Sequence, residues 1–188
     1  MAYKEVDTRI CAVVLALATL SNPFCSIAEE PSRPSSVYTD LSGSRCAAVT
    51  EDKETGASVH RCPGVNGWTL LVAYDDERMS ITVVEPNGAE HALNYWDVIT
   101  NGFSSLGTKA EWRVRRPNGR VEPIALIVRV NGSELREDGS RKPTSYLAVA
   151  TIDHERICVT NKINATPDAN QRARQAADKS AVEPCLQH

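Results

Sequence analysis

The cysteines are the residues whose type and spacing point most directly to chemistry, and the chain has six of them. Two, Cys11 and Cys25, lie in an amino-terminal segment that we expect to be removed. Those expected in the mature chain are Cys46, Cys62, Cys158 and Cys185. An even number of cysteines in an exported protein predicts disulfide bonds. The alternative is a zinc site or a redox dithiol, but the sequence has no C-x-x-C motif and no zinc-ligand spacing.

The predicted pairing joins Cys46 to Cys62 and Cys158 to Cys185. Cys46 and Cys62 lie in two strand-like runs that flank the polar segment 51–56, and a hairpin centred there places them directly opposite each other. Facing residues on paired strands are close enough to bridge, and closing a loop of about 15 residues contributes about 3 kcal/mol. Cys158 and Cys185 pair by elimination, and their bond would fasten a carboxy-terminal helix to a strand.

Histidines and carboxylates are the other groups that could do chemistry. An enzyme site would need His60 or His91 to meet an acid such as Glu90 or Asp97 across the fold. The adjacent acids at 75–77 could hold calcium, although neighbouring acids at a hairpin tip are usually solvated turn residues. No nucleophile elbow, phosphate loop, zinc-protease or dinucleotide motif occurs. We therefore predict no catalytic residue, no metal ligand and no cofactor.

Aromatic and basic side chains form the predicted binding patch. Tyr95, Trp96 and Phe103 gather in an irregular middle segment, where aromatic residues could supply the energy of an interface. The alternative is that these rings fill one end of the fold, as Trp68 and Trp112 of predicted strands fill its core. A second group surrounds one turn and could meet an anionic partner; it consists of Arg113, Arg115, Arg116 and Arg120. The alternative is a solvated strand edge, at which charge prevents edge-to-edge pairing.

The amino-terminal residues 1–28 have the pattern of a secretory signal peptide. Two basic residues precede the apolar run 10–20, whose eleven residues are too few to span a bilayer. Small residues at the end of the segment predict cleavage after Ala28. An uncleaved anchor and a lipoprotein modified at Cys25 are the alternatives. The pattern predicts a periplasmic or secreted protein whose mature form has no transmembrane segment.

Composition narrows the class of protein further. Hydrophobic residues make up 41% of the chain and charged residues 24%, which is ordinary globular usage and argues against a largely disordered protein. The formal net charge is −3, and removal of residues 1–28 takes away two bases and two acids and leaves it unchanged. A mildly acidic protein has no electrostatic basis for binding nucleic acid or anionic lipid.

The elements that must position these residues are mostly strands. Residues 29–36, rich in proline and serine, are expected to form a flexible leader before a single domain at 37–188. Apolar runs and polar–apolar alternation predict strands at 37–41, 44–50, 57–62, 68–74, 78–84, 109–115, 121–130, 144–152 and 156–160. The polar segments 104–107 and 131–142 are expected to be loops.

One convincing helix is predicted near the carboxy terminus. Thr166 would cap it, Pro167 and Asp168 suit its first turn, and the segment 169–180 has high helix propensity and an alanine-rich face. Consecutive strands joined by short turns pair antiparallel. The predicted fold class is therefore mainly β (β-rich α+β): an antiparallel sandwich or partly open barrel of about eight to nine strands with one C-terminal helix.

Several short motifs of the mature chain are similar to those of a known family. They are the segment 37–41 ahead of Cys46, the run His60-Arg61-Cys62-Pro63-Gly64, the run Glu111-Trp112-Arg113, and Cys158 leading into the Ala/Arg-rich helix and Cys185. By these motifs the chain resembles a family of small exported alphaproteobacterial proteins without known activity. The resemblance implies a bacterial periplasmic or secreted location and assigns no catalytic residue.

Together these observations lead us to expect a small exported protein of the cell envelope. A non-enzymatic binding module is favoured, with an envelope protein or a cell-wall component as its partner; this rests on fold-level analogy. A structural or stress-related envelope protein without a tight ligand is the first alternative. A hydrolase or metal-dependent envelope enzyme is the second.

Overall fold

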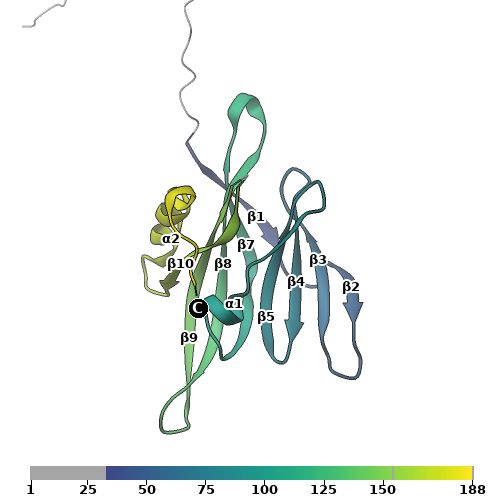
Figure 1. Cartoon of the computed structure of the whole chain (residues 1–188), viewed down its shortest axis with the longest axis vertical. Helices are drawn as coiled ribbons and strands as arrows, with labels where there is room; N and C mark the ends of the chain where they lie inside the picture. The colour runs from purple at the N-terminus through teal and green to yellow at the C-terminus, as the bar shows by residue number, and fades with distance from the viewer. Residues whose placement is uncertain (1–32, 154, 188) are drawn as a thin grey trace, which may run out of the picture. The chain divides into compact units, whose positions relative to one another are not determined.

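The computed structural model describes residues 33–153 and 155–187. They form two antiparallel sheets of five strands each, with a helix, α2 (Ala169–Ala177), near the carboxy terminus (Figure 1). The predicted mainly-β class is confirmed, and of the two predicted arrangements the sandwich is the one observed. The predicted signal peptide at 1–28 and its cleavage point lie outside the described residues. Within those residues, no helix is both long enough and apolar enough to cross a membrane.

The chain crosses between the sheets after its first strand and returns after its sixth. The first sheet has the order β1-β7-β8-β9-β10, with β1 (Ser35–Asp40), β7 (Phe103–Arg115), β8 (Glu122–Leu135), β9 (Arg141–Ile152) and β10 (Ile157–Asn164). The second sheet has the order β2-β3-β4-β5-β6, with β2 (Ala47–Glu51), β3 (Ser58–Pro63), β4 (Thr69–Asp75), β5 (Arg78–Val84) and β6 (Glu90–Ala92). The short helical segments are α1 (Tyr95–Val98), η1 (Pro117–Gly119) and η2 (Ser180–Val182).

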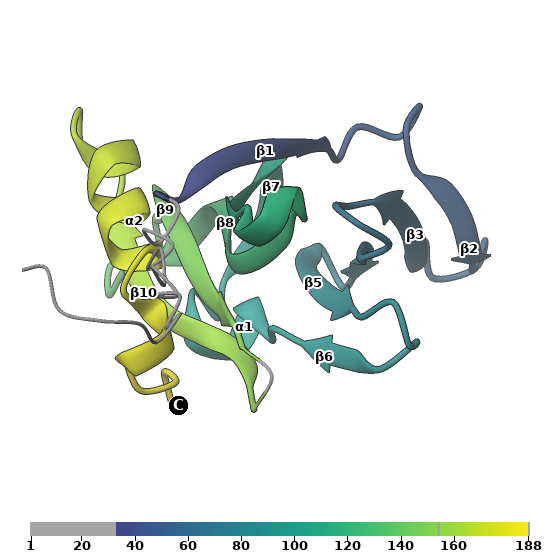
Figure 2. The same cartoon turned by 90° about the horizontal axis from the view of Figure 1, so that it is seen from above.

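The main core lies between the two sheets, and a smaller one lies under α2. Alternate residues of β8 face opposite sides of the first sheet: Leu126 and Val128 belong to the main core, whereas Ala125 and Ile127 lie beneath α2. Trp112 of β7 is fully buried in the main core, as the sequence predicts. Burying one such side chain contributes about 1.5–3 kcal/mol. The first sheet is thus the middle of three layers (Figure 2).

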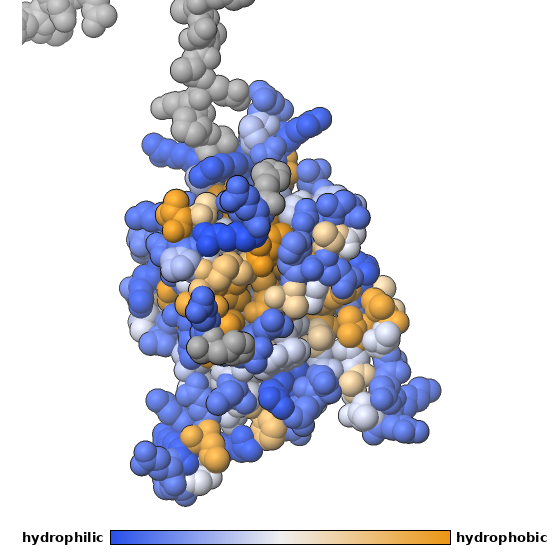
Figure 3. All heavy atoms as spheres, in the orientation of Figure 1, coloured by the Kyte–Doolittle hydropathy of each residue, from blue (hydrophilic) through white to orange (hydrophobic). Residues whose placement is uncertain are grey.

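One side of the sandwich is closed by irregular chain. Both α1 and the carboxy-terminal segment lie on the side that faces the viewer in Figure 1. In the same orientation, Figure 3 shows apolar side chains at the surface in the middle of this face, bordered by hydrophilic ones. The strands at this side, β6 and β10, touch without pairing. The two sheets therefore do not close into a barrel.

Small side chains allow α2 to lie close to the first sheet. Ala169, Ala173 and Ala177 are buried against β8 and β9, which confirms the predicted alanine face. The start of the helix differs from the prediction. Asp168, not Thr166, is the N-cap residue, and the Thr166 hydroxyl donates to the Asp168 carboxylate at 2.6 Å. The helix also ends earlier than predicted, at Ala177, and η2 follows it.

Both predicted disulfide bonds are present. The register of β2 and β3 places Cys46 directly opposite Cys62, and their Cα atoms are 4.2 Å apart. Cys158 of β10 is bonded to Cys185, which follows α2 and η2, with a Cα separation of 5.7 Å. The backbone N–H of Leu186 then donates to a carbonyl of β10 at 2.7 Å. The second bond therefore fastens the carboxy-terminal segment to the edge of the first sheet.

Several strands extend further than predicted. Residues 104–107, expected as a loop, belong to β7, and most of 131–142, also expected as a loop, lengthens β8 and β9 into one hairpin. Ser35 and Ser36, expected in the flexible leader, begin β1 and pair with β7. The short edge strand β6 has no counterpart among the predicted strands. The residues involved have low strand propensity, but a neighbouring strand satisfies their backbone groups whatever the side chains are.

Candidate functional site

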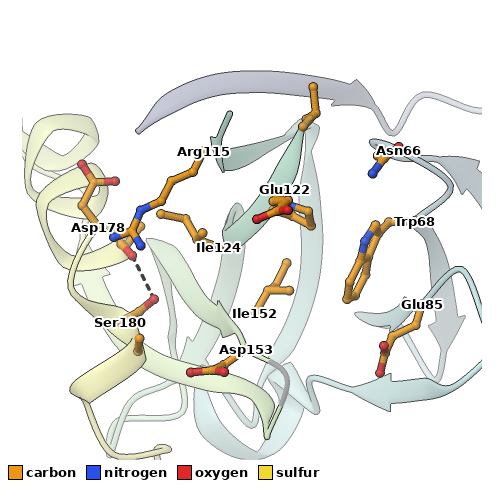
Figure 4. A pocket seen from close by; sticks show the side chains of 14 residues that line it. Asn66, Trp68, Glu85, Arg115, Glu122, Ile124, Ile152, Asp153, Asp178 and Ser180 are labelled. Carbon is orange, nitrogen blue, oxygen red and sulfur yellow. Dashed lines mark hydrogen bonds between the residues drawn. The ribbon is translucent and has the colours of Figure 1, made fainter. Parts of the chain in front are cut away.

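A groove of about 380 Å³ crosses the end of the first sheet at which β7 ends and β8 begins. Figure 4 shows its lining from close by. Trp68 and Glu85 project from the second sheet on one side, Ile152 stands in the middle at the end of β9, and Asp178 and Ser180 lie on the helix side. All three layers of the fold therefore contribute to one groove.

Trp68 is the largest apolar side chain of the groove. A tight turn before β4 holds it, because its backbone N–H donates to the Val65 carbonyl and its carbonyl accepts from the N–H of Gly64, both at 2.9 Å. The sequence predicts a core position for Trp68, and the ring does pack against the main core. It is only half-buried, however, and lies across the groove from Ile152 (Figure 4). Trp68 is therefore open to contact with a ligand.

Aliphatic side chains make up the rest of the floor. Ile152 is 6% exposed, and the half-buried residues from the start of β8 are Val121, Pro123 and Ile124. Residues at the ends of strands have fewer neighbours than those in the middle, so apolar side chains there remain partly open to water. The groove can bind a ligand with an apolar part.

The rim of the groove carries more carboxylates than cations. Its charged residues are Glu85, Arg115, Glu122, Asp153 and Asp178. Glu85 Oε1 lies 2.8 Å from Nε2 of His91, and Asp178 is bound by Arg113. Within residues 33–153 and 155–187, neither Glu122 nor Asp153 forms an ion pair. The rim is therefore negative in excess, with Arg115 as its one cation among the described lining residues.

Arg113 fixes the helix side of the groove. Its Nε and Nη2 donate to the two carboxylate oxygens of Asp178 at 2.8 and 2.9 Å. Its Nη1 donates to the hydroxyl of Ser36 at 2.6 Å, and Nη2 also donates to the carbonyl of Pro34 at 3.1 Å. Arg113 thereby ties β7 to the end of α2 and to the start of β1. A buried guanidinium requires such partners, and here the fold supplies four hydrogen bonds to it.

A second ion pair repeats this connection one turn earlier in α2. Arg174 donates to the two oxygens of Glu111 at 2.6 and 3.2 Å, and Ser36 donates to Glu111 at 2.5 Å. Burial opposes ionisation of Glu111, but the hydrogen bonds from Arg174 and Ser36 outweigh it, so the pKa of Glu111 lies below its ordinary value. The same contact with Glu111 raises the pKa of Arg174. Two charged contacts, one turn apart, therefore hold the carboxy-terminal part of α2 to β7.

The structure does not bring the predicted aromatic patch together. Tyr95 is 1% exposed and belongs to the main core, where burial raises the pKa of its hydroxyl. The interpretation that it fills the fold is therefore confirmed, and its place in a binding patch was wrong. Trp96 lines a shallow hollow beside Ala73 and Tyr74. Phe103 lies elsewhere, beneath the guanidinium of Arg141, whose carbon is 4.2 Å from the ring centre.

The predicted basic stretch is divided in the same way. Arg113 is 7% exposed and committed to Asp178, so it is not available to an anionic partner, and its assignment to the patch is corrected. Arg115 lines the groove. Arg116 is exposed and donates to the hydroxyl of Ser35 at 2.5 Å. Arg113 and Arg115 lie on the same face of β7 but at different distances from its end, and Arg116 lies beyond the strand, so the three side chains reach different surroundings.

His60 and His91, the two histidines in the described part of the chain, are not brought together with Glu90 and Asp97 as the predicted enzyme site would need. His91 contacts Glu85, rather than Glu90 or Asp97, and His60 is half-buried in β3. Among the acids at 75–77, Asp76 pairs with Arg78 across the turn between β4 and β5. In the part of the chain that the structure describes, no three potential metal ligands come together.

Sequence reasoning missed most of the groove. Glu122, Ile124 and Ile152 lie at strand ends, and nothing in a single sequence shows which strand ends share one surface. One signal was available: the Pro117–Gly119 turn and Pro123 mark where β8 begins. That signal locates the end of a strand, but it does not indicate that Trp68 lies opposite.

Comparison with known proteins adds no relative. No protein-family model matches the chain, and no curated protein or solved structure matches it. The function must therefore be argued from the geometry of the site.

Proposed function

We propose that this protein is an exported, non-enzymatic binding module of the bacterial cell envelope, and that its ligand occupies the groove lined by Trp68. The observation that carries the proposal is the placement of a half-buried tryptophan opposite Ile152 in a groove built by all three layers. Tryptophan is among the residues that contribute most to binding energy. A groove with an apolar floor and a polar rim is the usual form of a binding site.

Export is supported by two independent features. The two disulfide bonds fit an oxidising compartment such as the periplasm or the extracellular space. The segment 1–28 has the pattern of a signal peptide, and the resemblance to small exported alphaproteobacterial proteins agrees with it. Mass determination of the protein purified from its host would test cleavage after Ala28.

The test of binding is cross-linked capture with matched variants. The full chain is exported, purified with both disulfides formed, and incubated with envelope extract of its own host. Trp68→Ala is compared with Trp96→Ala, which removes the same side chain from a different hollow. We expect one stoichiometric partner, retained by Trp96→Ala and bound about 30-fold more weakly by Trp68→Ala.

Two results would contradict this function. If Trp68→Ala retained the partner as well as the parent protein does, the groove would not be the binding site. A blank capture together with a deletion phenotype that appears only under envelope stress would favour a structural or stress-related protein. Trp68→Phe serves as the folding control, since it keeps a ring in the same place, and melting temperatures of all variants are compared.

A further inference from the structure

We propose that the occupant of this groove is an extended, basic polypeptide segment, with an aliphatic side chain against Trp68 and Ile152 and lysine or arginine side chains at the rim. This inference rests on the proposed binding function and specifies the chemistry of its partner.

The course of the groove favours an extended ligand. It runs from the turn before β4, past the start of β8 and the end of β9, to the end of α2. Figure 4 shows these elements side by side, with Trp68 at one end and Asp178 at the other. Contacts along this course, from Trp68 to Asp178, suit a ligand in an extended conformation.

The charge of the rim favours a basic ligand. Of the four carboxylates, Glu85 lies beside His91 and Asp178 is held by Arg113, which leaves Glu122 and Asp153 to face the solvent or a ligand. Arg115 compensates for one negative charge at most. Carboxylates around a partly buried apolar floor attract a cationic partner and repel an anionic one.

The floor distinguishes a polypeptide from the other polymers of an envelope. Sugar rings stack on flat aromatic surfaces, but Trp68 is the one aromatic residue among the described lining residues. The other apolar ones are aliphatic residues and a proline, among them Ile124, Ile152 and Pro123. Anionic headgroups would meet the carboxylates of the rim. An aliphatic side chain fits the floor, and the long stems of its lysine or arginine neighbours reach the rim.

The test uses three labelled, capped peptides of equal length, in which leucine alternates with lysine, glutamine or glutamate. Binding to the purified oxidised protein is followed by fluorescence anisotropy at low and high salt. We expect the lysine peptide to bind about tenfold more tightly than the glutamine peptide, which corresponds to about threefold for each of two carboxylates. The glutamate peptide should bind most weakly, and salt should reduce all of these differences.

A pair of charge variants locates the preference. Glu122→Gln combined with Asp153→Asn should reduce the lysine preference to about twofold. The matched control combines Glu54→Gln with Asp75→Asn, which makes the same change in net charge in the turns at the opposite end of the second sheet. That control should keep the full preference.

Each contrary outcome has a definite meaning. Equal affinity for the three peptides, or an unchanged preference in the groove variant, overturns the basic ligand. Failure of the lysine peptide to bind would contradict the proposal that the ligand is a polypeptide. Binding of cell-wall glycan fragments that depends on Trp68 would show that the ligand is a saccharide instead. The capture experiment decides separately whether the groove binds anything, because it does not assume the chemistry of the partner.

Discussion

Arg113 of β7 and Asp178 at the end of α2 are joined by two hydrogen bonds, of 2.8 and 2.9 Å, in a bidentate ion pair. The side chain of Arg113 is 8% exposed and that of Asp178 is 31% exposed, so one charge is buried and the other reaches the groove. Bidentate pairs of this kind constrain direction as well as distance. The pair therefore fixes the end of α2 against β7 at the border of the groove.

Removal of the Arg113 charge should destabilise the protein. Arg113→Met leaves Asp178 without its ion-pair partner and removes one hydrogen bond of Ser36. We expect the free energy of unfolding to fall by about 2–3 kcal/mol. Urea denaturation measures it, and the double variant with Asp178→Ala should cost less than the sum of the single changes. The matched control is Arg116→Met, on the exposed end of the same hairpin, which should cost less than about 0.5 kcal/mol. If Arg116→Met lowered the free energy of unfolding as much as Arg113→Met does, the stabilising role assigned to the Arg113–Asp178 pair would be contradicted.

The contacts of Glu111 predict a specific dependence on pH. Its pKa in the folded protein lies below the ordinary value of 4.5, so the contribution of this carboxylate is complete above that value. It is lost as the pH falls through the lowered pKa, because protonation then breaks the pair with Arg174. Glu111→Gln should therefore be less stable than the parent at neutral pH, and the difference should shrink on acidification. A constant difference between pH 7 and pH 2, measured by urea denaturation, would show that the lowered pKa is not linked to folding.

Gly64 should tolerate no larger side chain. A Cβ at this position would lie 2.6 Å from the carbonyl oxygen of Trp68 and 2.7 Å from the ring of Trp112. Gly64→Ala should therefore cost about 1–3 kcal/mol through forced repacking. At Gly43 nothing lies within 4 Å, and Gly43→Ala should be neutral or stabilising by about 0.5 kcal/mol. Thermal unfolding compares the two, and equal melting temperatures would refute the close approach.

Tyr95 and Trp96 are neighbours in sequence but should respond differently to truncation. Tyr95 is buried in the main core, so Tyr95→Ala should cost about 3–5 kcal/mol through the cavity that it leaves. Trp96 is half-buried at the surface, and Trp96→Ala should cost less than half as much. Chemical denaturation of the two variants gives the comparison. If Trp96→Ala were the more damaging, the assignment of Tyr95 to the core would be incorrect.

Local patterns in the sequence were enough for the cysteine bridges and the class of fold. Cys46 and Cys62 are separated by a polar turn, and a hairpin leaves little freedom for how its two strands align, so their pairing follows from position alone. The alanine face of α2 and the alternation along β8 likewise reflect short-range periodicity. Each of these features depends on residues close together in the chain or on a simple repeat.

The binding groove depends on contacts between distant segments. Trp68, Ile152 and Asp178 share one surface because the start of β4 and the ends of β9 and α2 lie at the same side of the sandwich. A strand pattern shows which face of the strand is buried, but it does not show which other element covers that face. For the same reason Arg113 and Arg115 looked alike in sequence, although one is locked to α2 and the other lines the groove. Packing of the three layers separates them, since burial and ion pairing depend on which neighbour each strand meets.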